Sequence, residues 1–271
     1  MIGHARISPR SAWAFAWGAV IGTLGGLIGL GGAEFRLPVL IGFFRFRSLQ
    51  AVIINLIISL VTVVFSLVFR TGLAHLDVLA PYAPIVLNIL AGSLIGSYIG
   101  THLASRIREG ALHLVIVACL ICLSAVLIGH EYIFQVHAAE MPHAAKVGAG
   151  LLAGVVIGLV SGVLGVAGGE LIIPTLMLLY GIDIKMAGTL SLAISVPTIG
   201  AGLFRYSRSP IMRQVLPDAR LMIGMGLGSI LGALAGSHLV RYVPGSLLTM
   251  FLGIILVISA IRLYATRRDR S

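Results

Sequence analysis

Two glutamates lie inside apolar stretches of the chain, at positions where a charged side chain needs an explanation. Each one follows small residues directly: Gly31, Gly32 and Ala33 precede Glu34, and Gly168 and Gly169 precede Glu170. A carboxyl group within a membrane-spanning segment is costly and is a functional candidate by default. It could bind a proton and couple proton movement to transport, or it could cap its own short helix by accepting backbone hydrogen bonds. Both interpretations of Glu34 and Glu170 are kept open.

The residues around the glutamates favour an anion as the ligand. A helix that begins in mid-membrane presents unpaired N–H groups and the positive end of its dipole. Glycine lets the backbone itself approach a ligand. Small polar side chains follow at equivalent positions further along, and they suit an oxyanion, although ordinary interhelical hydrogen bonding explains them almost as well. The candidate substrate-binding residues are Gly31, Gly32, Ala33, Glu34, Asn55, Ser59, Gly168, Gly169, Glu170, Thr189, Ser191 and Ser195.

These residues recur because the chain contains an internal duplication. A shift of 136 residues places Gly26, Glu34, Pro38 and His102 on Gly162, Glu170, Pro174 and His238. Apolar composition alone would match leucines and valines, but it would not match glycine, glutamate, proline and histidine in one register. We therefore divide the chain into a first repeat (1–129), a linker (130–146) and a second repeat (147–271).

The composition places both repeats in a membrane. Of the 271 residues, 58% are hydrophobic and only 10% are charged, far from the balance of a soluble domain. Each repeat is expected to form five helical segments, of which the second, at about ten residues, rises only ~15 Å and cannot cross a bilayer. The expected segments are 11–30, 34–44, 50–70, 82–104 and 111–129, then 147–166, 170–180, 186–205, 219–240 and 247–265.

The distribution of basic residues predicts the topology. Arginines concentrate in loops that alternate along the chain, and the positive-inside rule places those loops in the cytoplasm. This works only if the first two segments of each repeat form a hairpin, re-entrant or fully spanning, followed by three crossings. The predicted fold is an all-α membrane protein of two inverted-topology repeats, with both termini cytoplasmic and the 130–146 linker outside. Inverted repeats with interrupted helices are typical of secondary transporters.

Other polar residues receive structural interpretations. Arg36, whose counterpart is Ile172, is interpreted as a residue that extends to the membrane surface, with substrate contact as the alternative. Cys119 and Cys122 are interpreted as packing residues and the linker histidines as solvated, so no metal and no cofactor are expected. His102 and His238 are placed near helix ends. Gly92, Gly96 and Gly100, with their equivalents Gly228, Gly232 and Gly236, are interpreted as helix-packing positions.

The glycine pattern also resembles a known family. The run Gly-x-x-Gly-x-Gly-Gly-x-x-x-x-x-Pro that ends at Pro38, its counterpart in the second repeat and the segment 187–191 resemble the TauE/SafE sulfite exporter family. The resemblance implies a multi-pass transporter of the bacterial inner membrane that carries small anions, such as sulfite or organosulfonates. The chain departs from the pattern at Ala33, where the second repeat keeps Gly169, and at 51–55, so individual contacts do not carry over automatically.

Two other functions fit the same residues. A passive anion channel would use the same helix ends, and a transporter of a non-sulfur carboxylate would use the same donors. An enzyme is not expected, because the apolar segments offer no nucleophile with a base nearby. The expected partners are a small anion and membrane lipid, with a homodimer compatible with so compact a transporter and no nucleic acid, since topology explains the net charge of +10.

Overall fold

The computed structural model describes residues 9–72, 76–104, 142–208 and 219–248, together with isolated positions beyond them. All regular elements in these ranges are helices, which confirms the predicted all-α class. Most of the predicted fifth segments, 111–129 and 247–265, lies outside the described residues. The same holds for Cys119, Cys122 and most of the 130–146 linker.

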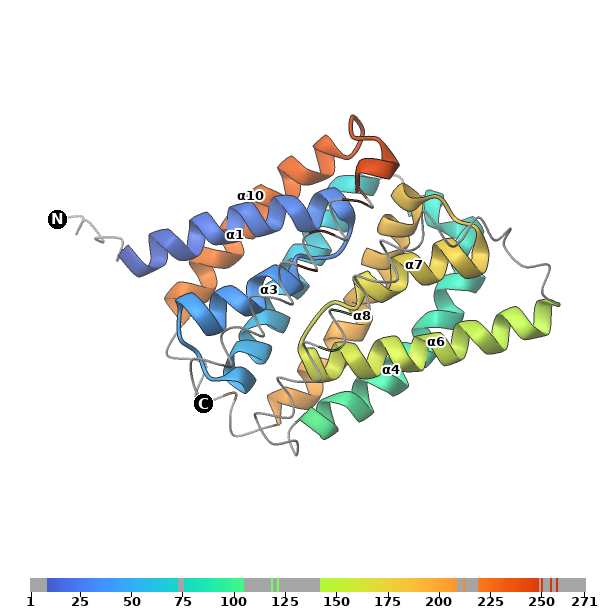
Figure 1. Ribbon diagram of the computed structural model, residues 1–271, viewed down its shortest axis with the longest axis horizontal. Coiled ribbons are helices and arrows are strands. Elements are labelled where there is room, and N and C mark those ends of the chain that lie inside the picture. The colour runs from blue at the N-terminus through green and yellow to red at the C-terminus, as the bar shows by residue number, and fades with distance from the viewer. Residues whose placement is uncertain are drawn as a thin grey trace.

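The two repeats form equivalent helices in the same order (Figure 1). The first repeat contains α1 (Pro9–Ile28), α2 (Ala33–Pro38), the π-helical segment η1 (Val39–Phe43), α3 (Ser48–Thr71), the 3₁₀ helix η2 (Leu76–Tyr82) and α4 (Ala83–Ala104). The second contains α6 (His143–Leu164), α7 (Gly169–Tyr180), α8 (Ile184–Ser207) and α10 (Ala219–Leu239). Helix α6 begins four residues before the predicted segment, at His143, and Pro142 is its N-cap residue.

Six stretches of the described chain are long and apolar enough to cross a membrane: Arg10–Ile28, Ser48–Thr71, Asp77–Ala104, Ala144–Val163, Ile184–Ser207 and Ala219–Leu239. Helix α7 has 12 residues and α2 has six, so neither reaches across a hydrocarbon core of ~30 Å. The predicted short second segment of each repeat is therefore confirmed. Helices α3 and α8 pack against each other and are the most buried of the six.

Glycines lock helices of one repeat against helices of the other. Gly22 of α1 packs on Ser229 of α10, and a Cβ atom added to Gly26 would lie 2.7 Å from the carbonyl oxygen of Ala233. Gly96 of α4 packs on Val155 of α6 in the same way. Backbones this close leave no room for a side chain, which is the small-residue packing that membrane helices use. An added Cβ atom would likewise meet the backbone of α6 or α1 at each glycine predicted to pack helices, which confirms that interpretation for Gly92, Gly96, Gly100, Gly228, Gly232 and Gly236.

The register of these contacts gives the direction of the helices. Along α1 and α10, contacts advance by four residues on both chains, from Gly22–Ser229 to Gly26–Ala233, so the two helices are parallel. Helices α4 and α6 are also parallel, since Gly96 contacts Val155 and Gly100 contacts Leu159. In the view of Figure 1, the equivalent helices α1 and α6 run in opposite directions. This is the arrangement that inverted repeats require, while the orientation of either repeat in a membrane stays a prediction.

Candidate functional site

The site is built on two backbone breaks, one in each repeat. Between α1 and α2 the backbone passes through the left-handed region at Gly29, Gly31 and Gly32, with φ of 95°, 82° and 71°. Between α6 and α7 it does so at Gly165 and Gly168. Only glycine adopts such angles without strain, so these residues end one helix and begin the next within a few positions.

The two breaks lie side by side. A Cβ atom added to Gly31 would lie 3.4 Å from the Cβ of Ala167, and one added to Gly169 would lie 3.0 Å from the Cα of Leu30. Segments that are 136 residues apart in the sequence thus form one centre. Gly31, Gly169 and their neighbours, predicted to share a site, are in contact across the repeat boundary.

Three of the predicted polar residues hold the breaks in place. The Asn55 amide nitrogen donates to the carbonyl oxygens of Ala33 at 3.0 Å and Gly165 at 2.9 Å. In the mirrored contact, the Ser191 hydroxyl donates to the carbonyl oxygen of Gly29 at 2.9 Å. The Ser195 hydroxyl donates to the carbonyl oxygen of Ala167 at 2.8 Å. The carbonyls of Gly29, Gly165 and Ala167 belong to backbone outside a helix, where buried polar groups need a partner, and that of Ala33 belongs to the first residue of α2.

Thr189 lies further from the breaks than the other candidates. Its hydroxyl donates to the carbonyl oxygen of Lys185 at 3.1 Å and accepts from Nη1 of Arg70 at 3.3 Å. Arg70 in turn donates to the carbonyl oxygens of Gly26 and Leu27 at the end of α1. The structure therefore places Thr189 at the junction of α1, α3 and α8.

Glu34 and Glu170 are the buried carboxyl groups of the site. They are 2% and 3% exposed, and each is the second residue of its short helix. Neither carboxylate oxygen of Glu34, nor Oε1 of Glu170, has a hydrogen-bond partner among the described residues. Glu34 thus makes no capping hydrogen bond of good geometry among the described residues, while its carboxyl still interacts with its own backbone N–H, so the capping and proton-binding interpretations of the glutamates both stay predictions.

Each short helix carries a proline in its interior. Pro38 and Pro174 are both the sixth residue of their helix. A proline has no N–H, so it cannot donate to the carbonyl four residues earlier, which belongs to Glu34 or to Glu170. Each glutamate thus combines a buried carboxyl group with a main-chain carbonyl that lacks its helical donor.

The interpretation of Arg36 as a residue at the membrane surface is wrong. Its side chain is 0% exposed. Nη1 donates to Ser59 Oγ at 2.9 Å and Asn55 Oδ1 at 3.3 Å. Nη2 donates to Thr62 Oγ1 at 3.1 Å and, at 3.4 Å each, to Ser229 Oγ and the carbonyl oxygen of Gly31. Because α2 packs against the polar face of α3, its arginine points into the protein.

Sequence reasoning missed Arg36 because its repeat counterpart is apolar. In the second repeat Ile172 occupies the equivalent position, and Thr198 and Ser93 hydrogen bond directly at an oxygen–oxygen distance of 2.7 Å. A signal was present nonetheless. Asn55 replaces a serine, Ser191, in the same repeat that carries the extra arginine, and the two changes fit each other in the structure.

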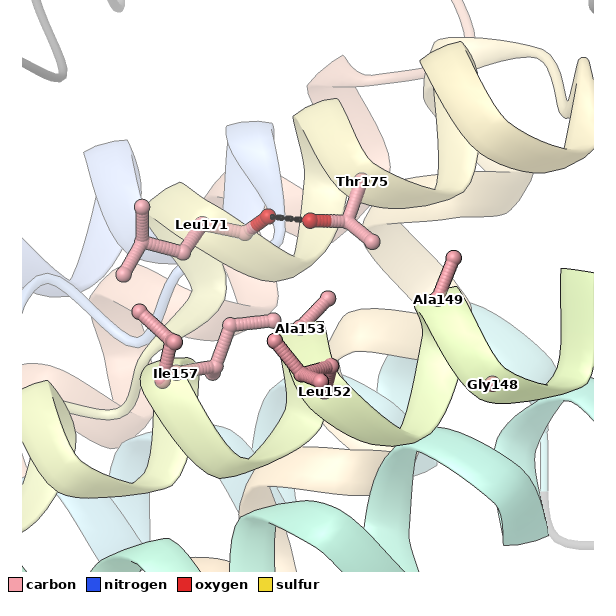
Figure 2. Close-up of a pocket in the computed structure, with 8 residues that line it drawn as sticks. Gly148, Ala149, Leu152, Ala153, Ile157, Leu171 and Thr175 are labelled. Carbon is pink, nitrogen blue, oxygen red and sulfur yellow. Dashed lines mark hydrogen bonds between the residues drawn. The ribbon is translucent and has the colours of Figure 1, made fainter. Parts of the chain in front are cut away.

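An outward-facing groove between α6 and α7 is separate from this polar centre. Figure 2 shows it, with a volume of about 480 Å³ and a lining that is almost entirely apolar. The hydroxyl of Thr175, its one side-chain polar group, donates to the carbonyl oxygen of Leu171. The lining residues are Gly148, Ala149, Leu152, Ala153, Val156, Ile157, Leu171 and Thr175.

The first repeat fills the equivalent groove with aromatic rings. Ala149 and Ala153 correspond to Trp13 and Trp17, whose rings lie 5.9 Å and 6.4 Å from the ring of Phe43. The groove is therefore a consequence of two small residues in the second repeat. None of the predicted substrate-binding residues lines it.

The histidines at the helix ends lie as predicted. His102 is in the last turn of α4, with Nδ1 2.9 Å from Nη2 of Arg205, and His238 is in the last turn of α10. Within the ranges that the structure describes, no group of three or more His, Cys, Asp or Glu side chains gathers in a way that could hold a metal ion.

Comparison with known proteins gives one match. Residues 2–128 match the family model described as "Sulfite exporter TauE/SafE". No curated protein and no solved structure matches the chain. The matched region covers all but the first and last residue of the first repeat, and it includes the α1–α2 break, Glu34, Arg36 and the polar face of α3. The chain is thus a multi-pass membrane protein whose residues 2–128 are similar to the family described as "Sulfite exporter TauE/SafE".

Proposed function

We propose that this protein is a secondary transporter of small anions, of the sulfite or organosulfonate type. The observation that carries this proposal is the contact between the two glycine breaks, which brings two short helices and two buried carboxyl groups to one centre. Broken backbone within a membrane protein is tolerated where it lines a transport site. The family match supports the transporter class and the anionic substrate.

The substrate contacts that we propose are the breaks themselves. Gly31, Gly32, Gly168 and Gly169 present backbone without side chains, and the N-terminus of α7 adds free N–H groups. Asn55, Ser59, Ser191 and Ser195 shape this centre through the hydrogen bonds that they make to break carbonyls or to Arg36. Exchange of one such bond for a substrate oxygen would accompany binding.

Glu34 and Glu170 are proposed to couple the anion to protons. An ionised carboxylate at this centre repels an anion, whereas a protonated carboxyl group is neutral and can donate a hydrogen bond. Proton binding and anion binding therefore favour each other, which is the requirement for symport. The Glu34 oxygens have no hydrogen-bond partner within the described part of the chain, and this supports the role, because a structural carboxylate would be paired.

The membrane setting that we propose is the bacterial inner membrane, with both termini in the cytoplasm. Parallel packing of α1 with α10, and of α4 with α6, supports two inverted repeats. The arginine-rich loops then face the cytoplasm.

Proteoliposomes containing the purified protein test this function. We expect saturable uptake of radiolabelled sulfite or sulfoacetate, accelerated when the same anion is loaded inside, because a carrier returns faster with substrate bound. Uptake that rises linearly with concentration and shows no such acceleration would indicate a passive channel. If the protein prefers acetate or another carboxylate over every sulfur oxyanion, it is still an anion transporter, but its substrate is a carboxylate. Absence of flux for every anion would overturn the proposal.

A further inference from the structure

The guanidinium of Arg36 is a buried cation whose hydrogen-bond partners among the described residues are all neutral, while the Glu34 carboxyl acts on it through electrostatics alone. Its four Nη hydrogens face hydroxyl groups, the Asn55 amide oxygen and the Gly31 carbonyl oxygen. No carboxylate is among these partners, and Nε, which is also buried, has no partner among the described residues. A buried positive charge is strongly unfavourable unless a negative charge or a full set of hydrogen bonds compensates for it. This arginine therefore keeps one N–H donor, at Nε, that an anionic partner can use.

The second repeat shows that the fold does not require this cation. Ile172 occupies the position of Arg36, and Thr198 and Ser93 close the space with a direct hydrogen bond. In the first repeat, the equivalent hydroxyls of Thr62 and Ser229 both accept from Nη2 of Arg36 instead. The same helix arrangement thus occurs with a buried cation in the first repeat and without one in the second. A residue that stability does not demand, and whose burial is unfavourable, points to ligand binding.

We propose that Arg36 binds the transported anion directly through the Nε–H edge of its guanidinium. This inference rests on the proposed function. It assigns recognition of the negative charge of the transported anion to the first repeat. The guanidinium lies against the Gly31 carbonyl, at the point where that break meets Ala167 of the other repeat. The asymmetry between Arg36 and Ile172 then gives the centre one fixed positive charge, next to carboxyl groups whose charge can change.

The geometry of this edge selects the class of anion. Nε and Nη2 present two parallel N–H groups, and the fork matches two oxygens of one sulfonate, sulfite or carboxylate group. Two of the three Nη2 contacts are at 3.4 Å, the long end of the hydrogen-bonding range, so an anion oxygen replaces them easily. A halide ion offers a single centre and cannot use both donors in this way.

Binding measurements on the purified protein test the role of Arg36. Isothermal titration with ethanesulfonate, acetate and chloride compares the wild type with Arg36→Ile, which copies the second repeat, and with Arg36→Lys. Arg205→Gln, which removes an arginine from the end of α8, serves as the control. We expect Arg36→Ile to bind ethanesulfonate at least tenfold more weakly and to unfold at a temperature no lower than that of the wild type without ligand. Arg36→Lys should keep weak binding and lose most of the preference for oxyanions over chloride.

The outcomes separate this inference from the proposed function. If the wild type binds ethanesulfonate and a folded Arg36→Ile binds it equally well, the inference is wrong and the anion transporter stands. If Arg36→Ile does not fold, Arg36→Lys decides: wild-type affinity together with the wild-type preference over chloride would overturn the inference. If the wild type binds no oxyanion and transports none, both the proposed function and this inference are wrong.

Discussion

Arg70 and Tyr206 occupy equivalent positions in the two repeats and make the same contact with different chemistry. Arg70 Nε donates to the carbonyl oxygen of Gly26 at 3.0 Å, and the Tyr206 hydroxyl donates to the carbonyl oxygen of Gly162 at 3.1 Å. Both carbonyls lie near the end of the helix that precedes a break, where helical donors run out. The contact ties the last turn of α3 or α8 to the first helix of its own repeat.

Tyr206→Phe tests this contact in the second repeat. The hydroxyl is lost while the ring, on a side chain that is 2% exposed, stays in place. Because the Gly162 carbonyl then lacks this donor, we expect the free energy of unfolding to fall by about 1–2 kcal/mol. Thermal unfolding in detergent measures the change. Tyr242→Phe, at a side chain that is 78% exposed, is the matched control, and an equal effect in both variants would contradict the assignment.

Asn55→Ala should be more damaging than Ser191→Ala. The Asn55 amide serves two break carbonyls and one guanidinium nitrogen, whereas the Ser191 hydroxyl serves one carbonyl. Each buried group that loses its partner costs about 1–3 kcal/mol. We therefore expect a loss of about 1 kcal/mol for Ser191→Ala and at least twice that for Asn55→Ala. Thermal unfolding measures both losses. Equal losses for the two variants would contradict the prediction, because the Asn55 and Ser191 contacts would then contribute equally to stability.

Gly232→Ala should disrupt the contact between α10 and α1. A Cβ atom at Gly232 would lie 2.6 Å from the Thr23 backbone nitrogen, so the two helices must separate. Gly226 lies in the same helix, and nothing lies within 4 Å of a Cβ atom added there. We expect Gly226→Ala to be neutral or slightly stabilising, since alanine favours the helix. Folded yield and unfolding temperature compare the two variants, and a well-folded Gly232→Ala would contradict the observed packing.

Ala153→Trp should be tolerated, because it restores the aromatic residue that the first repeat carries at Trp17. The groove between α6 and α7 has about 480 Å³ to receive the indole. We expect an unfolding temperature equal to or above that of the wild type. Ala233→Trp, at a side chain that is 0% exposed against Gly26, is the control and should fail to fold, because overpacking of a filled core is destabilising. If neither variant folds, the groove between α6 and α7 cannot accommodate an indole ring and the prediction is wrong.

Glu34→Gln and Glu170→Gln test proton coupling. In proteoliposomes, an acidic outside medium should drive anion uptake above the level reached without a pH gradient, because proton and anion move together. Glutamine keeps the shape of glutamate and cannot release a proton, so the gradient should no longer drive uptake while exchange of anion for anion continues. If both single variants and the double variant respond to the gradient as the wild type does, the protons pass elsewhere.

The repeat architecture was predictable because it depends on spacing. Glycine clusters followed by a short apolar segment define the breaks, and one constant offset relates Glu34 to Glu170. Matched glycines at intervals of four identify close helix packing, which the structure confirms for Gly96 and Gly232. These features are local, so the sequence alone contains them.

The partners of the polar groups were not predictable. Serine and asparagine donors are visible in the sequence, but their acceptors are break carbonyls that lie up to 162 residues away, as for Ser191 and Gly29. The direction of Arg36 was missed for a related reason. A helix of six residues has too few positions to define an apolar face, and only its packing against α3 decides which way the side chain points.

The interlocked glycines have a consequence for the order of synthesis. Helix α1 is complete once residue 28 has been made, but its close-packed partner α10 ends at Leu239, so α1 enters the bilayer long before its partner exists. Helix α4 likewise precedes α6, across the whole linker. The first repeat therefore leaves the ribosome with glycine-lined faces that the second repeat covers in the folded protein. The newly made first half must therefore persist in the membrane as an incomplete structure, open to other helices with small residues, until translation delivers the second.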